Sequence, residues 1–110
     1  ILNILHTHTE VVESEQVKTT IFDTKKGKIE LLSPSSSNSV IEKFIKNKGT
    51  GMHHVCLEVD DVNQAIIELK ENNIVLINNE PKIGAEGYKI VFIHPKSTGG
   101  VLVELAEKPK

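Results

Sequence analysis

Two ionisable side chains interrupt apolar segments of the chain, and their types suit metal and proton chemistry. Glu104 lies among Val and Leu in HPKSTGGVLVEL, and His54 follows His53 at the start of HHVCLEV. A carboxylate is costly to bury without a partner, and an imidazole on a second strand is a natural one. Nitrogen and carboxylate donors together suggest a divalent metal. About fifty residues separate His54 from Glu104, so the fold must bring them together.

An internal repeat adds a third residue to this pair. The segment VKTTIFDTKKGKIELLSP is echoed by YKIVFIHPKSTGGVLVELAE, and Glu30 in the first copy stands where Glu104 stands in the second. Each copy reads as a strand, a Lys-rich turn with Gly, and a strand containing Glu-Leu. A strand, a helix and another strand precede the second copy, whereas only residues 1–9 precede the first. The repeat therefore predicts two similar modules, with the opening strand and helix of the first one missing before residue 1.

Composition limits the kinds of protein this can be. The 110 residues suffice for one domain with a modest core. A net charge of −2 and a pI near 6.2 argue against nucleic-acid and membrane-surface partners. No apolar run reaches membrane-spanning length. The single cysteine, Cys56, excludes an internal disulfide framework, fits a reducing compartment and is expected to fill the core.

The elements that must position these residues alternate between strands and two helices. Ser39 followed by Glu42 has the capping-box pattern, and Asp60 or Asp61 can cap the second helix. Apolar residues recur at helical spacing after Asp61. The sequence predicts strands at residues 1–9, 16–24, 28–33, 52–59, 74–77, 88–94 and 101–106, and helices at 39–47 and 61–72, with a polar tail at 107–110.

Three segments together resemble the methylmalonyl-CoA epimerase family of the vicinal oxygen chelate superfamily, to which glyoxalase I also belongs. They are GMHHVCLEVDD, NNEPKIGAEGYKIVFIHPKSTGGVLVELAE and KIELLSPSSSNSVIEKFIKNKGTG, and the resemblance runs from about His8 to Glu107. It implies an α+β fold of paired βαβββ modules that close around a metal. Residues 1–110 would form a single glyoxalase-like domain, with an incomplete first module at 1–47 and the second module at 52–107.

The resemblance also implies roles for individual residues. The family's metal ligands fall on Glu30, His54 and Glu104, which would hold a divalent ion such as Co²⁺ or Mn²⁺. Glu104 would also be the base that removes the α-proton of methylmalonyl-CoA. A fourth ligand of the family, a histidine on the first strand of module one, has no counterpart here. Thr19 stands where some members carry a second glutamate, and a threonine cannot act as a base at neutral pH.

Further implications concern substrate, assembly and location. The substrate that the resemblance implies is an acyl-CoA, and Lys96 or Ser97 could reach its carboxylate or a phosphate. A module that lacks its first strand leaves an exposed sheet edge and apolar surface, which suggests a homodimer. The resemblance implies a cytoplasmic protein in a bacterium and a mitochondrial-matrix protein in a eukaryote.

Simpler interpretations stay open for each residue. Glu30 could face solvent on an edge strand, His54 could be a hydrogen-bonded core histidine, and Glu104 could point outward. His53 is expected to support its neighbour or to be structural. For the whole chain, the alternatives are another metalloenzyme of the superfamily, such as a lactoylglutathione lyase, or a non-catalytic binding module.

Overall fold

The chain forms two compact units, Ile1–Gly51 and Met52–Lys110. The computed structural model describes residues 4–13 and 15–110, so the opening of the predicted first strand lies outside the described residues. No helix in the described part of the chain is long and apolar enough to cross a membrane.

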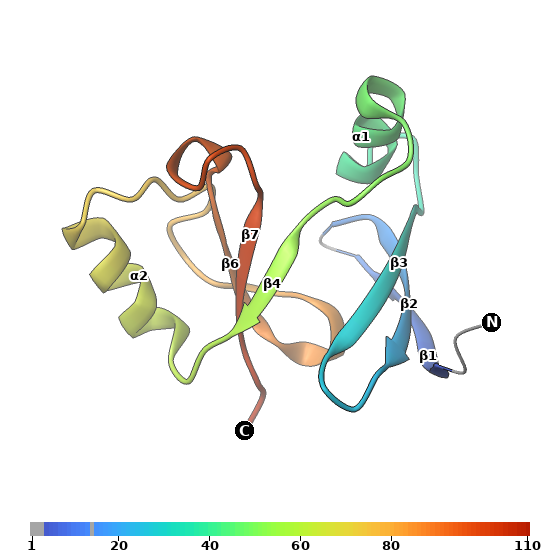
Figure 1. Ribbon diagram of the computed structural model, residues 1–110, viewed down its shortest axis with the longest axis horizontal. Coiled ribbons are helices and arrows are strands. Elements are labelled where there is room, and N and C mark those ends of the chain that lie inside the picture. Colours follow the sequence, from blue (N-terminus) through green and yellow to red (C-terminus); the bar gives the residue numbers. More distant parts are fainter. Residues whose placement is uncertain (1–3, 14) are drawn as a thin grey trace. The chain divides into compact units, whose positions relative to one another are not determined.

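The first unit is an antiparallel sheet followed by a helix (Figure 1). Strands β1 (Leu5–Val12), β2 (Val17–Asp23) and β3 (Lys28–Pro34) pair in the order β1-β2-β3. Alternate residues of β2 are buried: Val17, Thr19 and Ile21. Because side chains alternate between the faces of a strand, this pattern gives the sheet one buried face.

Helix α1 (Val40–Lys48) has the ends that the sequence predicts. The Ser39 hydroxyl accepts the backbone N–H of Ile41 at 3.1 Å, which satisfies one of the unpaired donors of the first turn. Gly49 ends the helix at φ 74°, and its N–H donates to the carbonyl of Ile45. That left-handed conformation favours glycine.

The second unit is a mixed sheet with a helix on one face (Figure 1). Strands β4 (Val55–Glu58), β5 (Lys82–Ile83), β6 (Lys89–Ile93) and β7 (Val103–Glu107) have the order β4-β7-β6-β5, in which β4 runs parallel to β7. Helix α2 (Val62–Glu71) is capped at its start by Asp61, whose side chain accepts the N–H of Gln64 at 3.0 Å. The helix packs on β6 and β7 through a buried apolar cluster: Val62, Ile66, Val91, Ile93 and Leu105.

Several local predictions differ from the structure. Residues 74–77 are not a strand and make a single bridge, between Leu76 and Ile93, while β5 lies where the sequence predicts no strand. Residues 52–54 precede β4 rather than belonging to it. Cys56 is exposed and does not fill the core. The reason is that β4 pairs with β7 on one side only in the described sheet, so an edge strand buries less of its side chains.

The two halves of the internal repeat form the same kind of hairpin, one in each unit. β2 and β3 pair antiparallel, as do β6 and β7. Glu30 lies opposite Ile21 in the first hairpin, and Glu104 lies opposite Phe92 in the second. The two glutamates therefore occupy matching places on the last strand of each hairpin.

Candidate functional site

His54 and Glu104 lie face to face in the second unit. The His54 Nε2 is 2.9 Å from the Glu104 Oε1, and their side chains are only 14% and 13% exposed. His54 directly precedes β4, and Glu104 lies in the neighbouring strand β7, opposite Cys56. The parallel pairing of β4 and β7 thus joins two side chains fifty positions apart in the sequence. The burial that is costly for a lone carboxylate is offset by this pairing.

Two further rings hold the His54 imidazole in place. Its Nδ1 lies 3.0 Å from the Nδ1 of His53, and the two rings meet edge to face. On another side the Phe92 ring packs edge to face with it, at a centroid distance of 6.0 Å. Phe92 is the cross-strand neighbour of Glu104 on β6. The His54 imidazole is therefore held by a contact at each of its nitrogens and by the Phe92 ring.

The pair has the chemistry and the spacing of two metal ligands. Two donors at adjacent corners of an octahedral ion, with bonds of about 2.1 Å, stand about 3 Å apart. The observed 2.9 Å between His54 Nε2 and Glu104 Oε1 matches that separation. Within residues 4–13 and 15–110, no cluster of three His, Cys, Asp or Glu side chains could hold a metal ion. The pair thus has the separation expected of two neighbouring ligands of an ion.

Glu30, the third predicted ligand, lies in the first unit on β3. Glu30 is exposed and lies opposite Ile21 of β2. Its role as a ligand together with His54 and Glu104 stays a prediction. Thr19, at the place of the family's second glutamate, is buried to 2% exposure and lies opposite Glu10 of β1.

The predicted substrate-binding residues lie in the short turn after β6. Lys96 is exposed, and its backbone N–H donates to the side chain of His94 at 3.1 Å. The Ser97 hydroxyl accepts the N–H of Val75 at 3.0 Å, so it ties this turn to the segment that follows α2. A hydroxyl that accepts one bond can still donate another. Substrate binding by Lys96 and Ser97 stays a prediction.

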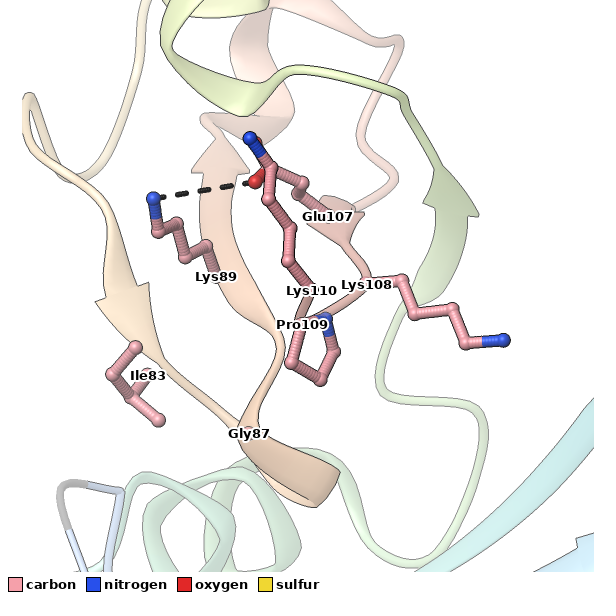
Figure 2. Close-up of a pocket in the computed structure, with 7 residues that line it drawn as sticks. All are labelled: Ile83, Gly87, Lys89, Glu107, Lys108, Pro109 and Lys110. Atoms are coloured by element: carbon pink, nitrogen blue, oxygen red, sulfur yellow. Dashed lines mark ion pairs between the residues drawn. The ribbon is translucent and has the colours of Figure 1, made fainter.

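A cavity of about 280 Å³ lies elsewhere in this unit, around the end of β7 (Figure 2). Lysine side chains gather at it, and Lys89 lies 4.0 Å from Glu107. Glu104 and Glu107 are three positions apart on the strand, an odd number, so their side chains point to opposite faces of the sheet. The cavity therefore does not belong to the His54–Glu104 pair.

Sequence reasoning missed two residues that shape this unit. Glu107, expected in a frayed polar tail, is 8% exposed, and its Oε1 accepts the N–H of Val62 at the start of α2 at 2.8 Å. Nothing in the sequence pattern indicated that Phe92 packs against His54. Alternation along KIVFI could have placed Phe92 on the face opposite the α2-facing Val91, because a strand has a period of two.

Comparison with known proteins identifies the class to which this fold and site belong. Residues 1–92 match the model of the Glyoxalase/Bleomycin resistance protein/Dioxygenase superfamily. The chain belongs to this superfamily, as its α+β fold leads one to expect. The predicted fold class is therefore confirmed.

Within the superfamily, several relatives are named methylmalonyl-CoA epimerase. The chain is 50% identical over 100 residues to the mitochondrial methylmalonyl-CoA epimerase of Dictyostelium discoideum, covering 89% of this chain and 60% of that protein. It is 53% identical over 81 residues to the mitochondrial enzyme of Bos taurus, covering 73% of this chain and 46% of that protein. The chain thus spans about half to three fifths of these relatives.

Solved structures give the same result. A structure of methylmalonyl-CoA epimerase in complex with methylmalonyl-CoA and NH4⁺ is similar, with a TM-score of 0.89 and 30% identity over 97% of this chain and 78% of that one. The predicted resemblance to the epimerase family is confirmed.

Proposed function

We propose that this chain acts as a methylmalonyl-CoA epimerase, which interconverts the (R) and (S) forms of methylmalonyl-CoA. Its relatives bear that name, and one related structure holds the substrate. The observation that carries the proposal is the largely buried His54–Glu104 pair, which is separated by 2.9 Å. It places an imidazole beside a carboxylate, as metal-assisted removal of a proton requires.

The proposed ligands of the divalent ion, Co²⁺ or Mn²⁺, are Glu30, His54 and Glu104. When bound, such an ion supplies Lewis-acid stabilisation to the negative charge that develops on the thioester oxygen. His54 and Glu104 fit this role because their donor atoms stand at the separation of neighbouring ligands. Phe92 and His53 keep the His54 ring from turning away.

Glu104 is the proposed base. Its carboxylate takes the proton from the carbon between the thioester and the free carboxylate, and the C–H electrons pass into the enolate. Return of a proton to the opposite face of that carbon gives the other epimer. The hydroxyl of Thr19 is no base at neutral pH, so the second proton must travel through a water or another side chain. Lys96 and Ser97 are proposed to bind the substrate carboxylate or a phosphate.

The architecture proposed for the chain is a single domain of two modules, residues 1–47 and 52–107. We also propose that it assembles as a homodimer. In the first unit Ile29 and Leu31 are 47% and 58% exposed, and β3 is an edge of the described sheet. Apolar side chains on an unpaired edge are stabilised when another chain covers them.

Proton exchange tests the proposed function directly. The protein expressed from its full reading frame is incubated with methylmalonyl-CoA and Co²⁺ or Mn²⁺ in deuterated water. Deuterium should enter the α-position, and a single epimer should become a mixture of both.

Two other outcomes would favour the alternatives. Isomerisation of a glutathione hemithioacetal without exchange into methylmalonyl-CoA would identify a lactoylglutathione lyase. Metal and acyl-CoA binding without any turnover would identify a binding module. Either result would contradict the epimerase proposal.

A further inference from the structure

His53 makes a contact that the proposed reaction does not use. Its Nδ1 lies 3.0 Å from the Nδ1 of His54, in a part-buried contact between residues adjacent in the chain. The opposite nitrogen of His54, Nε2, faces Glu104 at 2.9 Å. One imidazole therefore stands between a carboxylate and a second imidazole, and each of its nitrogens has a hydrogen-bonding partner.

The number of hydrogens on two neutral imidazoles limits which nitrogen can donate and which can accept. A neutral imidazole carries hydrogen on one nitrogen and a lone pair on the other. When Nε2–H of His54 donates to Glu104, its Nδ1 must accept, so His53 donates from Nδ1–H. When the lone pair of Nε2 is needed for a metal, the hydrogen of His54 stands on Nδ1. His53 must then accept at its Nδ1 and carry its own hydrogen on Nε2.

An imidazole at position 53 suits both states. It can donate or accept at the same nitrogen by exchanging one tautomer for the other, and the two neutral rings keep the same number of protons. A ligating histidine usually passes its second N–H to a neighbouring acceptor, which fixes the ring and its tautomer. Phe92, edge-on to His54 at 6.0 Å, confines the ring but offers no acceptor.

We propose that His53 is the positioning residue for the metal ligand His54. It accepts the Nδ1–H of His54 and so holds the Nε2 lone pair toward the ion shared with Glu104. This inference rests on the proposed metal-dependent function and adds to it a residue that touches neither metal nor substrate.

Metal affinity of paired variants tests the proposal. His53→Phe keeps a planar ring of similar size but has no acceptor. His53→Asn keeps an amide oxygen, Oδ1, bonded to Cγ where Nδ1 stands in histidine, and this oxygen can accept. The protein from the full reading frame is titrated with Mn²⁺ and with Co²⁺ in competition with a chelator. His53→Phe should bind about 10- to 100-fold more weakly, the loss typical of such outer partners, and His53→Asn should stay close to wild type.

Two controls accompany the titration. His6→Phe makes the same chemical change at an exposed histidine of β1 that bonds Thr9, and it should leave metal affinity unchanged. Thermal unfolding without metal shows whether each variant is folded. In the metal-loaded wild type, two-bond ¹H–¹⁵N spectra should place the hydrogen of His54 on Nδ1.

The outcomes separate this inference from the function on which it rests. Wild-type affinity in His53→Phe overturns the inference while metal binding by the protein stands. Equal weakening in His53→Asn and His53→Phe also overturns it, since the hydrogen bond would then not matter. If the wild-type protein exchanges the α-proton but binds neither Mn²⁺ nor Co²⁺, the reaction does not use these ions. The proposed metal site and the role of His53 are then both wrong.

Discussion

Glu104 is proposed to be both a metal ligand and the base. A substitution that removes the base but keeps an oxygen ligand separates these two roles. Glu104→Gln keeps the size of the side chain and one oxygen that can ligate. It loses the carboxylate that can accept a proton. We expect α-proton exchange of methylmalonyl-CoA to fall about 10²- to 10⁴-fold, the usual contribution of a general base, with weaker metal binding.

Glu30→Gln is the matched comparison. An amide oxygen can still bind a hard cation, and Glu30 is not assigned to the proton, so its loss of exchange should be smaller. Exchange into deuterated water and metal titration of both variants, made in the full reading frame, check this difference. Equal and small losses in both variants would show that Glu104 is not the base.

Residue types alone could predict part of this site. The carboxylate of Glu104 within an apolar strand required a partner, and His54 is that partner at 2.9 Å. The edge contact of Phe92 could not be predicted, because it depends on the register of β6 against β7. Glu30 was found through the internal repeat and the family resemblance, and its role as a ligand stays a prediction.

At the level of elements, helix-capping residues predicted the helix starts correctly, whereas one short apolar segment was wrongly predicted as a strand. Both helix starts were set by side chains visible in the sequence, Ser39 and Asp61. Residues 74–77 are apolar enough for a strand, yet only Leu76 forms a bridge to the sheet. Periodicity cannot distinguish a short apolar strand from an apolar segment that packs beside one.

The start of α2 is held by a residue from the far end of the chain, and this predicts a stability effect. Glu107 accepts the N–H of Val62 at 2.8 Å in a buried position. Glu107→Ala leaves that donor without its acceptor, which should lower the free energy of unfolding by about 1–3 kcal/mol. Glu107→Gln offers an amide oxygen in its place and should lose less.

Urea unfolding followed by circular dichroism measures this difference. Glu80→Ala, at an exposed position of the loop before β5, serves as a control that removes a carboxylate elsewhere in the same unit. If Glu107→Ala and Glu107→Gln were equally stable, the bond to Val62 would contribute nothing measurable.

At the scale of the whole molecule, the surface of the first unit predicts self-association. Ile29 and Leu31 pair with Phe22 and Thr20 of β2, so the two apolar side chains share one face of the sheet. They are 47% and 58% exposed in the chain described here. We expect a homodimer at micromolar concentration by sedimentation velocity, because burying such surface is favourable.

A double substitution tests whether this surface takes part. Ile29→Lys with Leu31→Lys places two charges on the exposed face and should shift the protein toward monomer. Lys25→Glu with Lys26→Glu in the preceding turn changes charge without touching apolar surface, and should leave the dimer intact. A monodisperse monomer for the wild type would contradict the assembly proposal.

The last prediction concerns the three proposed metal ligands. If Glu30, His54 and Glu104 bind one ion, each donor atom must lie within about 2.3 Å of it. His54 and Glu104 already meet the spacing this requires, at 2.9 Å between Nε2 and Oε1. Glu30 occupies the matching place in the first hairpin, opposite Ile21, as Glu104 does opposite Phe92. A repeat that preserves a carboxylate at the same register position in both hairpins is expected when both carboxylates bind the same ion. A crystal structure of the protein with Co²⁺ or Mn²⁺, with anomalous scattering to locate the ion, should find all three side chains around it. Carboxyl groups of Glu30 and Glu104 more than about 8 Å apart around a bound ion would be incompatible with those bond lengths, and would remove Glu30 from the site.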